Sequence, residues 1–350
     1  MSSTASAVEV KGFAPVPIID ISPFASEDPI ERSAVADAVG AACEGIGFIL
    51  VSGHGVPQDA IDEFYASARA FFEQPLEEKM RYKSPVDNLF QGYGCPGWGP
   101  GYHTSERQSF NVQRYDTLDE LLAHGYPEET SHVFLPALWP ETPGFRAAWR
   151  RYFEEMEALA GRLLRIFEAY LGLPEFWFAD KVDTDPSTQA ANYYSNEVDV
   201  GHEPTPYRFK AHLDGSVITI LYQDDGPGSL QLHQRGVGWR DVESVPGTFV
   251  LNLGELMARW TNDRFVATPH RVLKPVSGED APRISAPFFL KADVDATIEP
   301  IAELIADGEV ARYTPVTGLD WLLRDAKERY NNNDSTKRFE AMAAGTPYSE

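Results

Sequence analysis

The sequence predicts a mainly β protein with flanking helices, in which an α/β region precedes a sandwich or jelly roll. From Gln189 onward, short β-branched and aromatic runs alternate with turn residues, without helical patterns between them. Before that point, strand and helix patterns alternate from Val16 to Phe71. One long amphipathic pattern separates the two regions.

The N-terminal region reads as two strands and two helices. Short apolar runs predict strands at Val16–Ile21 and Gly47–Val51. Apolar residues at helical spacing predict helices over about Pro29–Glu44 and after Pro57. The region contains no constellation of chemically active side chains of its own.

Residues 84–116 are rich in glycine and aromatic residues, a composition that excludes a regular helix. Long loops inside compact domains are often functional. We interpret the segment as a wall or lid of a substrate site, with an ordinary surface loop as the alternative. Its candidate substrate contacts are Trp98, Tyr102 and Arg107.

The longest helix is predicted over about Gly144–Leu171, ended by Gly172 and Pro174. Its apolar stripe indicates core packing against a sheet rather than a cofactor-binding face. A shorter helix is predicted at Trp321–Tyr330, before a polar tail. We therefore expect an N-terminal α/β region over residues 1–180, a jelly-roll core over 181–310 and a C-terminal helix and tail over 311–350, forming one integrated unit.

Composition limits the possible partners. The formal net charge of −23 would repel nucleic acid and anionic lipid, and no apolar run has the length of a membrane span. The first eight residues lack the pattern of a secretory signal, and two cysteines are too few for a disulfide framework. We expect a cytoplasmic protein that binds a small molecule; no pattern indicates an oligomeric state.

The pattern His212-x-Asp214, answered by His270, supplies the residue types of a 2-His-1-carboxylate metal site. Residues two apart in a strand point to the same side, so His212 and Asp214 can face one interior. Such a triad leaves one face of the metal open, which suits ferrous iron that binds O2 together with an organic ligand. A single His-x-Asp occurs by chance, so the prediction depends on its companions.

Two further pairs point to carboxylate binding. Arg283 and Ser285 alternate on a predicted strand, and a guanidinium fork beside a hydroxyl is suited to holding a carboxylate. A structural ion pair is the alternative for Arg283. Asn192 and Tyr194 share a face of an earlier strand, where an amide and a phenol can hydrogen-bond a carboxylate-bearing co-substrate.

As a set, these motifs closely resemble the isopenicillin N synthase-like family of Fe(II)/2-oxoglutarate-dependent dioxygenases. The resemblance runs from Val16 to about Tyr330 and includes an N-terminal Gly-His-Gly-Val-Pro segment, in which His54 is expected to be structural. The remaining shared motifs are Asn192-x-Tyr194, His212-x-Asp214, Gly254-Glu255, Thr261-Asn262, His270-Arg271-Val272 and Arg283-x-Ser285-x-Pro287-Phe288-Phe289.

The resemblance implies a double-stranded β-helix (jelly roll, cupin-like) core, with the long helix lying across the barrel. It implies that His212, Asp214 and His270 bind Fe(II). Arg283 and Ser285 would hold the distal carboxylate of 2-oxoglutarate, and Asn192 and Tyr194 would help to hold the co-substrate. The expected site therefore consists of His212, Asp214, His270, Arg283, Ser285, Asn192 and Tyr194. The activity implied is O2-dependent hydroxylation, desaturation or cyclisation of a small molecule, in specialised-metabolite biosynthesis such as that of antibiotics.

Two alternatives stay open. One is an iron oxidase that works without 2-oxoglutarate, in which the Arg283 and Ser285 pair holds a carboxylate of the substrate. The other is a non-catalytic binding module on a decayed oxygenase site. The chain departs from the family pattern at Ser195, where many members have proline, and in the insert that follows over residues 196–206. Phe288, with Trp98 and Tyr102, suggests a partly aromatic substrate pocket.

Overall fold

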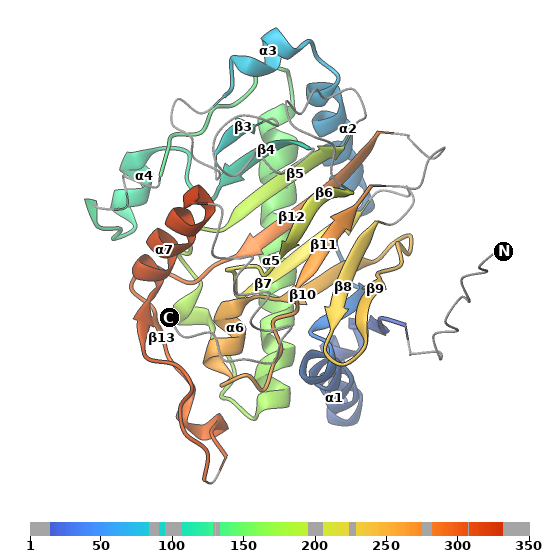
Figure 1. The fold of residues 1–350 in the computed structure, drawn as a ribbon, viewed down its shortest axis with the longest axis vertical. Coiled ribbons are helices and arrows are strands. Elements are labelled where there is room, and N and C mark those ends of the chain that lie inside the picture. Colours follow the sequence, from blue (N-terminus) through green and yellow to red (C-terminus); the bar gives the residue numbers. More distant parts are fainter. Residues whose placement is uncertain are drawn as a thin grey trace, which may run out of the picture.

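The computed structural model describes residues 15–83, 91–94, 107–128, 130, 134–194, 206–223, 229–274, 282–306 and 308–331. In these ranges a large sheet lies between a smaller sheet and a layer of helices (Figure 1). The long helix α5 (Phe145–Leu171) runs behind the large sheet in this view. None of the described helices combines the length and apolar character that a membrane span needs.

The N-terminal elements belong to the same body as the rest of the chain. Their bounds are β1 (Ile18–Asp20), α1 (Pro29–Gly45), β2 (Phe48–Ser52), α2 (Gln58–Phe72) and α3 (Leu76–Met80). Pro29 opens α1, and the Asp28 side chain caps it by accepting a hydrogen bond from the Ile30 amide. Strand β2 pairs with β1 on one side and with β10 on the other, so the predicted α/β region shares its sheet with the core.

The large sheet has the order β1-β2-β10-β7-β12-β5-β4-β3 and the smaller sheet the order β6-β11-β8-β9. The remaining strands of the large sheet are β3 (Gly92–Gly94), β4 (Gln108–Gln113), β5 (Thr188–Tyr194), β7 (Ile218–Gln223), β10 (Phe249–Leu253) and β12 (Arg283–Leu290). The smaller sheet contains β6 (Tyr207–His212), β8 (Leu230–Gln234), β9 (Gly238–Asp241) and β11 (His270–Leu273). Two facing, mainly antiparallel sheets confirm the predicted jelly-roll core.

The helix layer buries one face of the large sheet, as the apolar stripe of α5 predicts. Gly144 and Gly172 flank this helix, both with the positive φ that glycine adopts readily. Trp149 and Tyr152 are fully buried between α5 and the neighbouring helix α2, where Phe64 lies against both rings. Burying each such side chain stabilises the fold by roughly 1.5–3 kcal/mol.

The alternation of β12 corrects one sequence prediction. Phe288 was expected in the substrate pocket, but its fully buried ring packs edge-on against Phe153 of α5, with 5.2 Å between the ring centroids. Because neighbouring residues of a strand point to opposite faces, Phe288 lies on the helix side of the sheet, whereas Arg283 and Ser285 lie on the side of the smaller sheet. Phe288 is therefore a core residue and not a substrate contact.

The space between the two sheets is apolar on one side only. Residues of β2, β8 and β10 form a separate buried cluster that includes Phe48, Leu50, Leu230, Leu232 and Val250. Strands β4, β5 and β12 instead turn polar side chains toward the smaller sheet. The jelly roll thus holds a packed side and a polar side, and the polar side borders the predicted metal ligands.

The remaining elements close the ends of the core. They are α4 (Leu118–Ala123), α6 (Glu255–Trp260), the paired strands β13 (Thr297–Ile298) and β14 (Val316–Thr317), and α7 (Gly318–Asn331). Helix α7 confirms the predicted C-terminal helix. Its buried Trp321 donates an indole hydrogen bond of 2.8 Å to the carbonyl of Gly215, one residue after Asp214. His54 is structural, as expected, since its ring accepts from the Val56 amide.

Candidate metal centre and its polar surroundings

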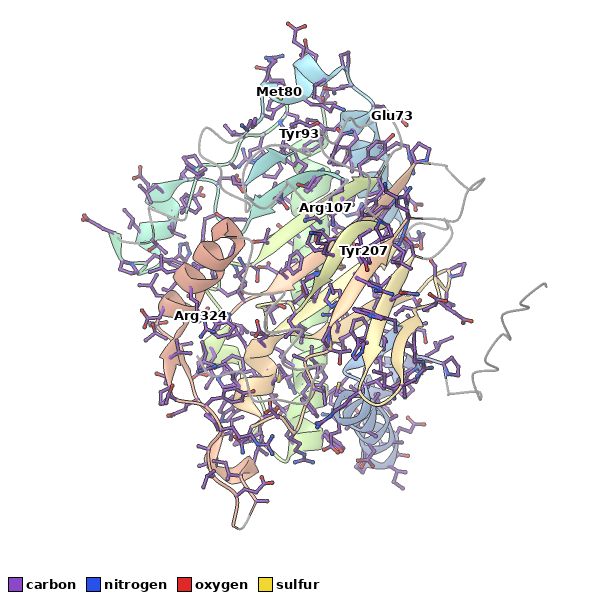
Figure 2. All side chains as sticks on the ribbon, viewed as in Figure 1. Glu73, Met80, Tyr93, Arg107, Tyr207 and Arg324 are labelled. Carbon is purple, nitrogen blue, oxygen red and sulfur yellow. The ribbon has the colours of Figure 1, made fainter. Side chains whose placement is uncertain are left out.

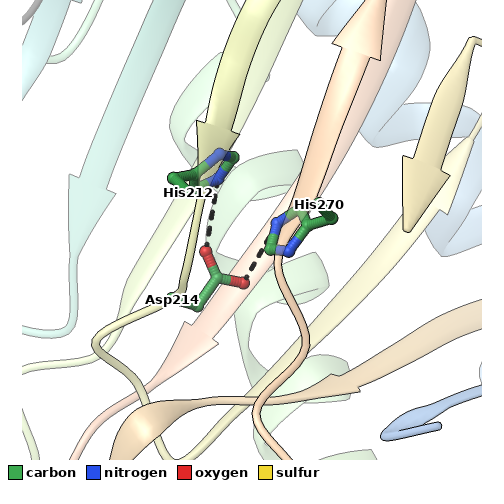
Figure 3. Close-up of side chains that lie close together, drawn as sticks. All are labelled: His212, Asp214 and His270. Carbon is green, nitrogen blue, oxygen red and sulfur yellow. Dashed lines mark ion pairs between the residues drawn. The ribbon is translucent and has the colours of Figure 1, made fainter. Parts of the chain in front are cut away.

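The three predicted metal ligands lie close together at one end of the smaller sheet (Figure 3). His212 ends β6 and His270 begins β11, and the two residues are directly paired across these strands. Asp214 follows in the loop after β6, with its Oδ1 atom 3.6 Å from His212 Nε2 and its Oδ2 atom 3.7 Å from His270 Nε2. One candidate ligand atom from each residue lies within 4.8 Å of the others.

Both imidazole rings are oriented by their own backbone. His212 Nδ1 lies 2.9 Å from the carbonyl oxygen of Lys210, and His270 Nδ1 lies 3.2 Å from that of Thr268. A carbonyl can only accept, so each Nδ1 carries a proton, which leaves Nε2 as the nitrogen that can bind a metal. Metal-binding histidines are typically held in this way, with the second nitrogen donating to a backbone carbonyl.

The carboxylate of Asp214 is held by two side chains from the large sheet. Thr219 of β7 donates to Oδ2 at 2.6 Å, and Asn252 of β10 donates to the same oxygen at 2.8 Å. All three residues are buried. Sequence reasoning did not identify Thr219 or Asn252, although strand alternation was the available signal: Thr219 pairs with Asn252, which places both on one face.

The loop that carries Asp214 is also fixed through its backbone. The amide of Glu255, at the start of α6, donates to the Asp214 carbonyl at 2.9 Å. A Cβ atom on the preceding Gly254 would stand 1.9 Å from the carbonyl oxygen of Ser216, so only glycine allows this close approach. With the Trp321 bond to Gly215, two elements from outside the β6 strand hold the loop in place.

The electrostatics of the triad suit a divalent cation. Burial, and then the neighbouring His270, lower the pKa of His212 to about 3, so this ring is neutral at pH 7. Burial acts to raise the pKa of Asp214, but the two imidazoles and the two donors outweigh it and lower that pKa overall. Two imidazoles and one ionised carboxylate form the donor set of a facial Fe(II) site.

A row of polar side chains crosses the large sheet beside the triad. Ser109, Asn192, Ser285 and Gln223 are in register on the adjacent strands β4, β5, β12 and β7. The Asn192 amide lies 3.5 Å from Ser285 Oγ. The structure therefore brings the predicted Asn192 and Ser285 together and adds two residues that sequence reasoning missed.

Arg283 of β12 pairs with Tyr194 of β5, two positions along from the Ser285 and Asn192 pair, and both residues are buried. The Arg283 guanidinium donates to Ser229 Oγ at 2.8 Å and to Gln223 Oε1. Both printed hydrogen bonds fix the plane of the guanidinium fork, the geometry in which an arginine can bind a carboxylate.

Arg107, just before β4, lies between the two sheets (Figure 2). Its Nη1 atom donates to Asn192 Oδ1, and its guanidinium carbon stands 4.1 Å from the ring centroid of Phe209 on β6. The Phe209 ring in turn contacts that of His212 edge-on, at 4.3 Å between centroids. Trp98, Tyr102 and residues 196–205 of the insert lie outside the described residues.

Comparisons with known proteins agree with this geometry. Residues 16–142 match the family model for the N-terminal region of non-haem dioxygenases in morphine synthesis, and residues 186–292 match that of the 2OG-Fe(II) oxygenase superfamily. A 2-oxoglutarate-Fe(II) type oxidoreductase of Metarhizium majus is 31% identical, over 91% of this chain and 88% of its own. Isopenicillin N synthase of Streptomyces clavuligerus is 32% identical, over 84% and 90%.

Among solved structures, a 2OG-Fe(II) oxygenase family protein from Caulobacter crescentus superimposes with a TM-score of 0.75 at 25% identity. The match covers 89% of this chain and 99% of that one. The similarity therefore includes the helix layer and both sheets, and is not confined to the metal motif.

Proposed function

The chain belongs to the 2OG-Fe(II) oxygenase superfamily, and we propose that His212, Asp214 and His270 are the ligands of its iron. The observation that carries this assignment is that one candidate ligand atom from each of the three residues lies within 4.8 Å of the others. Bound Fe(II) supplies the activation of O2, and 2-oxoglutarate supplies two electrons as it is decarboxylated to succinate. The residues of the chain orient these reactants and exclude water.

We assign the distal carboxylate of 2-oxoglutarate to Arg283 and Ser285. Arg283 is held by Gln223 and Ser229, which fixes the plane of its fork before any ligand arrives. Ser285 is in register between Asn192 and Gln223, so its hydroxyl lies beside the fork on the same face. Tyr194 and Asn192 border the same space and are assigned to the co-substrate as well.

The primary substrate is a small molecule, which the superfamily and the position of the metal ligands between two sheets favour. We propose a role in specialised-metabolite biosynthesis, including that of antibiotics, supported by the 32% identity to isopenicillin N synthase. The reaction is a hydroxylation, desaturation or cyclisation, because these outcomes differ only in how the substrate is positioned. We also propose that the protein is cytoplasmic, and that its chain is divided at about residues 180 and 310 into an N-terminal region, a jelly-roll core and a C-terminal helix and tail.

The test is anaerobic visible absorption of the protein with one equivalent of Fe(II), before and after addition of 2-oxoglutarate. We expect the weak charge-transfer band of a chelated 2-oxo acid, and its loss in Asp214→Ala. Stoichiometric iron without the band would favour the alternative oxidase, in which Arg283 holds the substrate. No iron binding would contradict the metal assignment and favour a non-catalytic module.

A further inference from the structure

Neighbouring residues form hydrogen bonds with only part of the Arg107 guanidinium. Its Nη1 atom donates to Asn192 Oδ1, and its flat face rests on Phe209. Its Nε atom is buried and has no hydrogen-bond partner among the described residues, and none of their carboxylates forms an ion pair with this side chain. A buried guanidinium N–H without an acceptor costs free energy that a bound ligand can recover.

The charge of Arg107 is not needed for iron and co-substrate. In the proposed site, the charges of Fe(II) and of the Arg283 guanidinium are balanced by Asp214 and by the two carboxylates of 2-oxoglutarate. Arg107 adds a further positive charge to the space between the two sheets. This excess is notable in a chain whose formal net charge is −23.

The position of Arg107 separates it from the co-substrate fork. Its guanidinium is one aromatic ring away from the metal ligand His212, through Phe209. Arg283 instead lies across the sheet on β12, held by Gln223 and Ser229. The unbonded edge of Arg107 therefore borders the metal side of the site, next to Asn192, and not the Arg283 fork to which the distal end of 2-oxoglutarate is assigned.

We propose that Arg107 binds a carboxylate of the primary substrate, so that the enzyme acts on small carboxylic acids. The guanidinium edge formed by Nε and Nη2 matches a carboxylate with two parallel hydrogen bonds. Nη1 stays on Asn192, which fixes the plane of the fork, and Phe209 supplies an apolar surface for the adjoining part of the substrate. This inference rests on the proposed function of the site.

The experiment compares acids with their uncharged amides as probes. Benzoate with benzamide, and phenylacetate with phenylacetamide, are titrated anaerobically into the Fe(II) protein saturated with 2-oxoglutarate, with calorimetry and the charge-transfer band as readouts. We expect the wild type to bind the acids at least tenfold more tightly than the amides. Arg107→Gln keeps an amide donor for Asn192 and should weaken acid binding by about 10- to 100-fold, as expected for a lost charge-assisted pair.

Arg151→Gln is the matched control, because it removes the same charge from an exposed ion-paired position on α5. Its preference for acids should equal that of the wild type, and Arg107→Lys should retain part of it. Acids that bind no better than amides, or a preference that survives in Arg107→Gln, would overturn the inference. The band with 2-oxoglutarate alone separates the two proposals: its absence in the wild type contradicts the proposed function, whereas its presence without acid preference contradicts only the role of Arg107.

Discussion

Replacing Thr219 by valine tests how the metal-binding carboxylate is held. The change is nearly isosteric and removes the hydroxyl that donates to Asp214 Oδ2 at 2.6 Å. Asn252 then remains as the side-chain donor to that oxygen. We expect weaker Fe(II) binding with an intact fold, because the carboxylate keeps its position in the loop and loses part of its orientation.

The magnitude follows from the burial of this contact. Thr219 and Asp214 are each only 3% exposed, so water cannot replace the lost donor. Removing a residue that orients a metal ligand typically lowers metal affinity 10- to 100-fold, or about 1.4–2.8 kcal/mol. Asn252→Leu should have a similar effect. The two effects should not add in the double variant, because both donors serve the same oxygen.

The assay is the Fe(II) dissociation constant, measured under nitrogen by competition with a chromophoric chelator. Thr188→Val is the matched control, since Thr188 is equally buried on the same face of the sheet and its hydroxyl has no hydrogen-bond partner among the described residues. Asp214→Ala should abolish binding. If Thr219→Val bound iron as tightly as Thr188→Val, the hydroxyl would not orient the carboxylate.

Three further changes test other parts of the structure. Arg283→Gln should raise the dissociation constant of 2-oxoglutarate about 10- to 100-fold by calorimetry, and an equal loss of iron affinity would argue against its assignment. Burial, and then a hydrogen bond with Asp183, raise the pKa of Asp293 to about 7. The folded chain thus keeps a proton that the unfolded chain releases above about pH 4, so stability falls as pH rises between these values. Asp293→Asn should remove up to about 3 kcal/mol of that fall between pH 5 and pH 8 in urea unfolding, and an unchanged pH dependence would contradict this pKa. Trp321→Phe should lower stability by about 0.5–1.5 kcal/mol and weaken iron binding several-fold through Gly215; unchanged iron affinity would show that α7 does not position the loop.

Much of the site follows from local rules that a sequence displays. The alternation of a strand places Arg283 and Ser285 together, and the spacing of His212 and Asp214 needs only a strand end and a short loop. The same rule excludes Phe288, an odd number of positions from Arg283, and would have placed it in the core. An aromatic residue next to the Arg283-x-Ser285 motif is therefore not by itself a sign of a pocket residue.

Contacts between distant strands could not be predicted in the same way. Thr219 and Asn252 reach Asp214 because β7 and β10 are neighbours in one particular register, and no local pattern specifies that register. The contact between Arg107 and Asn192 likewise depends on the pairing of β4 with β5. Sheet order is a property of the whole fold, set by the cores on both faces of the large sheet.

The two sheets contribute different chemistry to the site. The smaller sheet supplies the histidines, each oriented by its own backbone, so these ligands need little support from elsewhere. The large sheet supplies the side chains that hold Asp214 and the arginine that we assign to the co-substrate. Asp214 lies in the loop between the two sheets. Thr219 and Asn252 hold its carboxylate, and the Glu255 amide holds its backbone carbonyl. Metal affinity should therefore depend on how the two sheets are packed, and a substitution in the apolar cluster around Leu232 and Val250 can weaken iron binding without touching a ligand.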